Sequence, residues 1–278
     1  MKVLRNDAAQ YVSRFGRTDR VLHGCLMFSF LGLALTGLPL VFSHAPWAAV
    51  LARALGGVPA AGVLHRVCAV VLIAVFLTHV ARLVKRVVLD RDYTIFWGPA
   101  SMVPQPRDLD ELRRHLLWFV GRGPRPRFER YTYWEKFDYW AVFWGMAIIG
   151  GSGLMLWFPE AFSHLVPGWV FNIALLVHGE EALLAVGFIF TIHFFNGHLR
   201  PEKFPMDMVI FTGRVSEAEL RHERPGEYER LQASGELERL AMPAPQRSTV
   251  TLGRSIGTLA VAIGLSLVGL IIYALIAH

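Results

Sequence analysis

The chain has 278 residues, of which 54% are hydrophobic and 18% charged, with a mean hydropathy of +0.40. This balance excludes an ordinary soluble domain of the same length. The formal net charge is +6, but the basic residues lie in loops beside apolar segments, which indicates membrane topology and argues against nucleic acid as a partner. Neither of the two cysteines, Cys25 and Cys68, belongs to a CxxC or CxxCH motif, so we expect no disulfide, zinc ribbon or covalently attached haem.

Five stretches are long and apolar enough to cross a bilayer as helices, which takes roughly 20 residues each. In chain order they are Val21–Phe42, Gly62–Val84, Phe137–Phe158, Trp169–Asn196 and Ser255–Ala277. The fourth is longer than needed, so we expect it to tilt or protrude. The predicted fold class is all-α: an integral membrane bundle of five transmembrane helices in a single membrane domain, residues 1–278.

The distribution of Lys and Arg predicts the orientation of the bundle. The segment before the first span carries Lys2, Arg5, Arg14, Arg17 and Arg20, and the connections 85–136 and 197–254 are also rich in basic residues. The other two connections contain only Arg53. The positive-inside rule therefore places the N-terminus and the two long connections in the cytoplasm and His278 in the periplasm, in a bacterial inner membrane.

Both long connections show helical patterns of their own. Residues Asp108 to Val120 alternate charges with leucines, which predicts an amphipathic surface helix. Ser216 to Leu240 begins with a capping-box pattern at Ser216 and Glu219 and is interrupted at Pro225. Solvated linkers and caps that skim the membrane are both compatible with these patterns.

Histidines inside the spans carry the strongest chemical signal. Polar side chains in lipid are costly and usually mark a function, and five histidines lie within or at the rim of spans: His23, His65, His79, His178 and His193. His65 and His79 are fourteen residues apart, which returns them to within about 40° of one helix face at about 21 Å separation. His178 and His193 are fifteen apart, or about 60° and 22 Å.

Two helices that each offer an upper and a lower imidazole match the needs of haem iron, which takes two axial ligands from facing helices. The spacing therefore predicts two haem b groups in a four-helix core, with His65 and His178 toward the outside and His79 and His193 toward the inside. His23 competes with His79 as a ligand of the inner iron. Because one histidine is additional, a third haem is not excluded. Arg66 and Arg82 are candidates to pair with haem propionates, although snorkelling to the interface explains Arg82 equally well.

Such a protein would transfer electrons between a periplasmic redox partner and membrane quinone. Quinone reduction requires titratable groups near a haem, and the candidates are Glu135, Lys136 and Asp138 before the third span and His198 and Arg200 after the fourth. The chain would then be the quinone-reactive subunit of a larger oxidoreductase. Two alternatives remain: a metal transporter with a histidine-lined path, and a haem-bearing membrane anchor without a quinone site.

The order of these residues resembles a known family. Arg17, Asp19, Arg20 and His23, then Leu35-Thr36-Gly37, Leu64-His65-Arg66 and two histidines on the fourth span are similar to the di-haem cytochrome b subunits of formate dehydrogenases, nickel-iron hydrogenases and thiosulfate reductases. The resemblance covers residues 14–200. It implies that His65 and His178 hold the outer haem, that His23 and His193 hold the inner one, and that the partner is an iron-sulfur, molybdenum or hydrogenase subunit.

Three features depart from that family: the fifteen-residue spacing on the fourth span, where fourteen is usual, the additional His79, and the fifth span with its long preceding connection. The spacings also resemble the cytochrome b of bc-type complexes, in which His65, His79, His178 and His193 would be the ligands. The strings from Tyr133 to Asp138 and from Asn196 to Pro201 are similar to cytochrome b subunits that work beside periplasmic multihaem cytochromes c.

Overall fold

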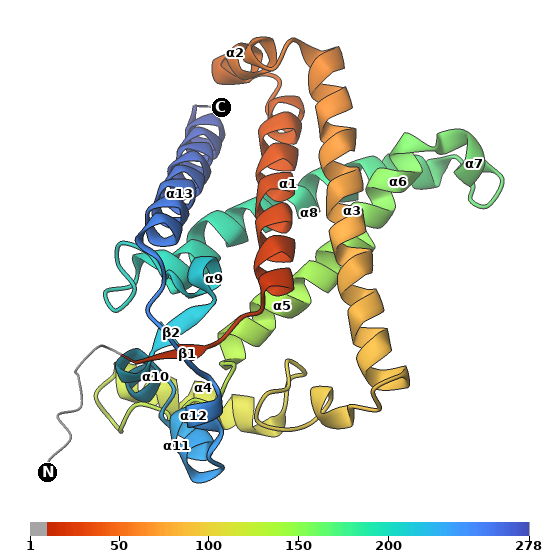
Figure 1. Cartoon of the computed structure of the whole chain (residues 1–278). Coiled ribbons are helices and arrows are strands. Elements are labelled where there is room, and N and C mark those ends of the chain that lie inside the picture. Colours follow the sequence, from red (N-terminus) through yellow and green to blue (C-terminus); the bar gives the residue numbers. More distant parts are fainter. Residues whose placement is uncertain (1–9, 278) are drawn as a thin grey trace, which may run out of the picture. The chain divides into compact units, whose positions relative to one another are not determined.

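The computed structural model describes residues 10–277. Within them, five helical segments are long and apolar enough to span a membrane (Figure 1): Arg17–Val41, Val58–Val88, Tyr133–Trp157, Trp169–Leu199 and Arg247–Ile276. The predicted all-α membrane fold is confirmed. Four of the five segments begin earlier than predicted, because each helix continues beyond the apolar stretch that predicted it. The predictions about Lys2, Arg5 and His278 fall outside the described residues.

Two of the five spanning segments are not continuous α-helices. The third consists of α5 Tyr133–Gly145, the π-helical η2 Met146–Gly150 and α6 Gly151–Trp157. The fourth consists of α8 Trp169–Phe188 followed by the π-helical η3 Ile189–His193 and η4 Phe195–Leu199. The other three are α1 Arg17–Val41, α3 Val58–Val88 and α13 Arg247–Ile276. A π turn takes up one residue more than an α turn, so it rotates the following side chains relative to a regular helix.

The long connections fold into short helices. The predicted surface helix is confirmed as α4 Pro106–Phe119, and Ser216 caps the next predicted helix by accepting a hydrogen bond from the Glu219 amide at 3.2 Å. Pro225 begins a separate helix, as predicted. The remaining elements are α2 Pro46–Ala54, η1 Tyr93–Ile95, α7 Pro159–Ser163, α9 Val209–Thr212, α10 Glu217–Glu223, α11 Pro225–Ala233 and α12 Glu236–Arg239.

A small antiparallel sheet, absent from the sequence-based prediction, joins three distant parts of the chain. Its strands are β1 Tyr11–Ser13, β2 Arg214–Ser216 and β3 Ala241–Met242, in the order β2-β1-β3. Tyr11 pairs with Ser216 on one side and with Met242 on the other. Strands of two or three residues are too short to show an alternation of apolar and polar residues, so no sequence pattern predicts them.

The chain forms two compact units. The connection unit contains the residues up to Arg20, Ala81–Trp140 and Met208–Gly253, and it includes the sheet, α4 and α9 to α12. Its core is formed by Val12, Val209, Val215, Leu220, Leu231 and Leu237. The span unit contains Val21–Val80, Ala141–Asp207 and the residues from Arg254 onward, and it carries all five histidines predicted to be functional.

In the span unit, α13 packs against α1 and the end of the fourth span. The shared core contains Leu31, Ala34 and Leu38 of α1, Phe190 and Phe194 beside His193, and Ala260, Leu267 and Ile271 of α13. A Cβ atom on Gly264 would lie 2.7 Å from the Phe190 ring, so only glycine allows this approach. Between membrane helices such packing, rather than the hydrophobic effect, drives association. The fifth spanning helix, α13, therefore supports the segment that carries His193.

Candidate functional site

His65 of α3 and His178 of α8 face each other in the span unit. Their ring centroids are 6.3 Å apart and their planes are inclined by 69°. Imidazole nitrogens bind metal ions at about 2 Å, so two rings on opposite sides of one ion have centres roughly 6 Å apart. The pair therefore has the separation that a shared metal ion requires.

Hydrogen bonds define which ring nitrogen of each histidine carries the proton. The Thr36 hydroxyl donates to the Gly32 carbonyl at 2.7 Å, so its oxygen accepts from His65 Nδ1 at 2.8 Å. His178 Nδ1 lies 3.0 Å from the Ile149 carbonyl, which only accepts hydrogen bonds. Both rings therefore carry hydrogen on Nδ1 and keep the lone pair on Nε2 for a ligand bond. Metal-binding histidines are usually oriented by such a bond from the other nitrogen.

Two glycines leave room for these rings. A Cβ atom on Gly37 of α1 would lie 3.3 Å from Cε1 of His65. A Cβ atom on Gly153 of α6 would lie 2.9 Å from Cε1 and 3.3 Å from Nδ1 of His178. Gly37 and Gly153 therefore allow helices α1 and α6 to approach the two histidine rings.

The other two histidines of the expected family pattern also lie near each other. His23 of α1 has His193 and His198 as its electrostatic neighbours, and His198 in turn has His193 and Asp207. These residues all belong to the span unit. His193 ends η3, and its ring centroid is 6.4 Å from that of Phe194. The structure thus gathers His23, His193 and His198 into a second histidine group.

His79 of α3 has a different environment. Its ring packs edge to face against Phe143 of α5, with centroids 6.2 Å apart, and Phe143 also contacts Phe76 one helical turn away. Within residues 10–277 no group of three or more His, Cys, Asp and Glu side chains has the arrangement of a metal site. The facing imidazoles His65 and His178 form a pair.

The comparison with known families covers the part of the chain that carries these histidines. The family model described as prokaryotic cytochrome b561 matches residues 14–200, which include all five histidines. The chain belongs to this family. A comparison with curated proteins finds no match. Membership makes the protein an integral membrane b-type cytochrome that binds haem b and acts in electron transfer, and it confirms the resemblance to di-haem cytochrome b subunits.

The π-helical segment η3 explains the unusual histidine spacing of this cytochrome b561. His178 and His193 are fifteen residues apart, and η3 occupies the last five positions of that interval. Because the π turn absorbs one additional residue, the two rings are related roughly as they would be fourteen residues apart in an α-helix, within about 40° of one face. The departure from the family pattern is therefore accommodated locally and keeps both histidines on one side.

Gly153→Ala is expected to displace the His178 ring, because the new methyl group would lie 2.9 Å from its Cε1 atom. We expect at least half of the haem associated with this histidine to be lost, measured as haem content per chain and as the amplitude of the reduced α band. Gly151→Ala is the matched control on the same helix, since nothing lies within 4 Å of its added Cβ. The control should keep its spectrum and stabilise the helix by up to about 1 kcal/mol. Equal spectra in both variants would contradict the role of Gly153.

The two arginines proposed for propionates differ in their contacts. Arg66 follows His65, and its Nε donates to the Gly62 carbonyl at 3.0 Å while the side chain stays exposed. Arg82 pairs with Asp19 at 2.8 Å, and both side chains are about two-fifths exposed. Arg82 therefore already has a carboxylate partner within the protein, whereas Arg66 has only a backbone carbonyl.

Two of the quinone candidates take part in ion pairs. Lys136 is 1% exposed and donates to both carboxylate oxygens of Asp108, at 2.8 and 2.9 Å. Glu135 accepts from Arg224 at 2.8 Å and from the Thr132 amide and hydroxyl. These contacts fasten the start of α5 to α4 and to the residue before α11. Both charges thus have a structural role within the connection unit.

The other three quinone candidates are half-buried. His198 lies in η4, and its Nδ1 atom is buried without a hydrogen-bond partner among the described residues. Arg200 directly follows η4, and Asp138 lies on α5. Of the five candidates, His198 is the one that belongs to the second histidine group.

Sequence reasoning missed several residues that shape these sites. In the sequence, Thr36 is notable only as part of the Leu35-Thr36-Gly37 string, whereas the structure shows that its hydroxyl orients His65. The Ile149 carbonyl and Ser152 Oγ, which lie 3.0 and 3.3 Å from His178 Nδ1, gave no signal, because one is backbone and the other a common helix residue. Ile149 belongs to η2, which periodicity does not reveal.

Glu111 of α4 was also missed. Burial, with the neighbouring Asp108 carboxylate second, raises the pKa of Glu111 to about 7; Arg107, Lys136 and Arg224 oppose the shift. Its Oε2 atom is buried without a hydrogen-bond partner among residues 10–277. The sequence signal was indistinct, because Glu111 is one of several charges in the 108–120 pattern.

Glu111→Gln is expected to raise thermal stability at pH 8 and to change it little at pH 5. The folded state keeps the Glu111 proton up to about pH 7, above the ordinary carboxyl value of 4.5, so its favourable contribution is lost as pH rises through that window. We expect a gain of a few degrees, since each kcal/mol is worth roughly 2–4 °C in chains of this size. Glu236→Gln, at an exposed site on α12, is the control and should show no such pH dependence. A Glu111→Gln effect that is the same at both pH values would contradict the assignment.

Proposed function

We propose that the protein transfers electrons across the bacterial inner membrane through two haem b groups, between a periplasmic redox partner and the membrane quinone pool. The observation that carries the proposal is the His65 and His178 pair, with ring centroids 6.3 Å apart and Nδ1 of each ring engaged in a hydrogen bond. Each Nε2 is thereby left as a neutral ligand, which costs no charge in lipid.

The residues around this pair fit a haem with two axial histidines. Gly37 and Gly153 remove side-chain bulk beside the rings, and Thr36 and the Ile149 carbonyl hold the ring orientation. Hydrogen bonds from Nδ1 make an imidazole a stronger electron donor. The exposed guanidinium of Arg66, adjacent to His65, is the group we assign to a propionate. When bound, the haem supplies reversible one-electron chemistry.

For the second haem we assign His23 and His193 as ligands. The electrostatic proximity of His23 to His193 supports this choice. His178 and His193 lie about 22 Å apart along the fourth span, so the two haems would stand at two depths of the membrane. The chain thereby spaces two electron carriers across a layer of low dielectric constant.

The distribution of basic residues supports an orientation with the N-terminus in the cytoplasm. The haem of His65 and His178 is then the periplasmic one, and it would exchange electrons with a multihaem cytochrome c or with an iron-sulfur, molybdenum or hydrogenase subunit. The haem of His23 and His193 lies toward the cytoplasm, where quinone would bind. The chain would act as the quinone-reactive subunit of such an assembly.

Quinone exchanges protons as well as electrons, and His198 is the group that we assign to this exchange. Its buried Nδ1 has no hydrogen-bond partner in the described chain, and it lies beside His23 and His193. A quinone carbonyl accepts a hydrogen bond from such a nitrogen, and the imidazole can pass the proton on. Glu135 and Lys136 are already held in ion pairs and would serve to keep the adjoining helix ends in place.

His198→Gln is expected to slow haem reduction by a soluble quinol analogue about tenfold or more, because a positioned proton-transfer group is lost. The measurement is stopped-flow absorbance of the α band with the protein in lipid nanodiscs. Both haems should remain, as shown by dithionite-reduced spectra. His222→Gln, at an exposed position on α10, is the matched control.

Experiments on the unaltered protein distinguish a quinone-reactive subunit from a haem-bearing membrane anchor. If dithionite reduces both haems but no quinol or quinone analogue reduces, oxidises or spectrally perturbs either one, the quinone assignment is wrong and the anchor alternative holds. If the purified protein binds metal ions and shows no b-type spectrum, electron transfer itself is excluded.

A further inference from the structure

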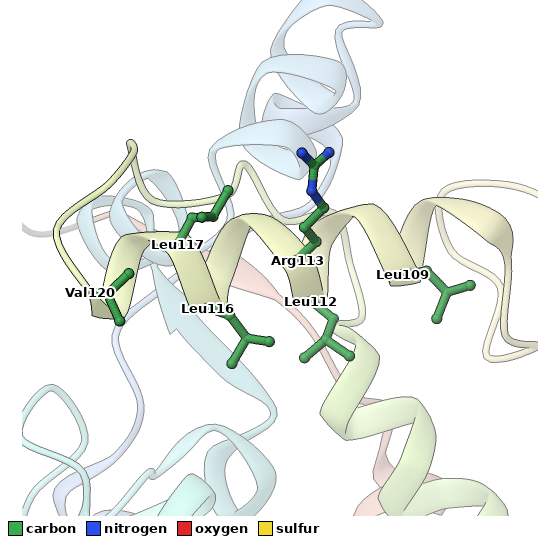
Figure 2. A pocket seen from close by; sticks show the side chains of 6 residues that line it. All are labelled: Leu109, Leu112, Arg113, Leu116, Leu117 and Val120. Carbon is green, nitrogen blue, oxygen red and sulfur yellow. The ribbon is translucent and has the colours of Figure 1, made fainter.

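The α4 helix carries an apolar surface that the rest of its unit does not cover. Leu109 is 72% exposed, Leu116 55% and Val120 67%. Together with Leu112, Leu117 and Arg113 they line a shallow groove of about 400 Å³. Figure 2 shows Leu109, Leu112 and Leu116 projecting from one side of the helix, while the Arg113 guanidinium turns toward the other. Contiguous exposed apolar surface of this kind usually marks an interaction site.

A neighbouring side of α4 is fastened to the start of a membrane-spanning helix. Asp108 holds the buried Lys136 of α5, and the buried His115 ring packs against Trp134 at 5.4 Å between centroids. The indole nitrogen of Trp140 donates to the Met102 carbonyl just before α4 at 3.0 Å. These contacts lie within the connection unit, so the placement of α4 against the first turns of α5 is determined.

The leucines lie on the side of α4 toward which the first turns of α5 run (Figure 2). Since α5 begins a membrane-spanning segment, α4 lies next to the point at which the chain enters the bilayer. The Arg113 side chain leaves the helix near the same leucines but carries its charge away from their tips, which is the snorkelling geometry of an arginine at a membrane surface.

The chain on both sides of α4 has the composition of a membrane interface. Seventeen residues, 89–105, separate α4 from the end of α3, and thirteen, 120–132, separate it from α5. The first connection exposes Tyr93, Phe96 and Trp97, at 62%, 50% and 67%. Aromatic residues of this kind gather at the headgroup level. Basic residues lie along α4 and just after it in the sequence: Arg107, Arg113, Arg122 and Arg125.

We propose that α4 is an interfacial helix that lies in the headgroup region of the membrane, with Leu109, Leu112, Leu116 and Val120 against the acyl chains and its arginines bound to anionic lipid phosphates. Helices with one leucine-rich face and a basic border bind membranes in this way. Contact between this leucine surface and the lipid would hold α4 at the membrane depth at which Asp108 binds Lys136 at the start of α5. The proposal depends only on the protein being an integral membrane protein and not on the haem or quinone assignments.

The test uses the full-length haem-loaded protein in vesicles of phosphatidylcholine and phosphatidylglycerol. In a background with Cys25→Ser and Cys68→Ser, single cysteines replace Leu112 and Leu116 or, as matched controls, Asp110 and Arg114, which form an exposed ion pair on the same helix. Each cysteine carries a bimane fluorophore. Quenching by lipids with a spin label near the top of the acyl chain is expected to be at least threefold stronger at Leu112 and Leu116 than at the controls, and quenching by iodide should show the reverse order.

Three outcomes would overturn the proposal. Equal iodide quenching at all four positions would mean that the leucines face water. Protection from both quenchers would mean that protein, such as a second copy of this chain, covers the surface. Unchanged quenching in vesicles of phosphatidylcholine alone would remove the anionic-lipid component.

A second measurement does not depend on cysteine variants that fold. In the unaltered protein, phosphatidylglycerol with a photoactivatable group in its acyl chain should label the peptides that contain Leu112 and Leu116, as read by mass spectrometry. Labelling confined to the five spanning segments would contradict the proposal.

Discussion

His178→Ala is expected to remove one of the two haems and to leave the other in place. The haem content should fall from two to about one per chain, and the reduced α band should lose about half of its amplitude. The reason is geometric: His178 faces His65 at 6.3 Å between ring centroids, and its Nδ1 is held by the Ile149 carbonyl, so the alanine removes the oriented imidazole that we propose as an axial ligand. Pyridine haemochromogen assays and dithionite-reduced spectra measure both quantities.

Two further variants test whether this result is specific to the His65 and His178 pair. The double variant His65→Ala with His178→Ala should lose no more haem than either single variant, because both residues would hold the same iron and their effects are not additive. His164→Ala, at an exposed position after α7, is the control and should keep both haems. Unchanged haem content in His178→Ala would remove the observation on which the electron-transfer proposal depends.

His23→Ala is expected to remove the second haem, whereas His79→Ala should keep two. His23 is electrostatically coupled to His193, while the ring of His79 packs against Phe143. A redox titration should therefore change from two steps to one in His23→Ala only. His79→Ala is itself the matched control, since it also removes an intramembrane imidazole.

The opposite pattern would assign the ligands differently. If His79→Ala loses the second haem and His23→Ala keeps it, the bc-type arrangement is correct. If the unaltered protein binds three haems and each substitution removes one, both histidines are ligands. Either outcome would leave the assignment of His65 and His178 intact, because the two levels are about 22 Å apart along the fourth span.

The membrane fold was accessible from the sequence because it depends on a one-dimensional signal, and the same signal singled out the histidines as candidates. A spanning helix must satisfy its own backbone hydrogen bonds over roughly 20 apolar residues, and a histidine inside such a stretch is rare enough to stand out. The helix limits were less accurate: α13 begins at Arg247, eight residues before the predicted Ser255, because hydropathy does not register where a helix continues beyond the bilayer.

The quinone candidates show the limit of the same reasoning. Glu135 and Lys136 were chosen for charge and position, yet their partners Arg224 and Asp108 lie 89 and 28 residues away in the chain. No local pattern distinguishes a carboxylate that is held by a distant arginine from one that is available for proton exchange. The small sheet around β1 was missed for the same reason, since its strands come from three remote segments.

The sequence by itself determined that the chain has five helices able to span the membrane and that five imidazoles lie in or beside them, because hydrophobic length and residue order are local properties of a helix. Only the tertiary structure decided which imidazoles meet, how Thr36 and Ile149 orient them, and that η3 absorbs the fifteenth residue between His178 and His193. Those features depend on contacts between helices and on one π turn. Such contacts are set by packing in three dimensions and leave no periodic trace along the chain.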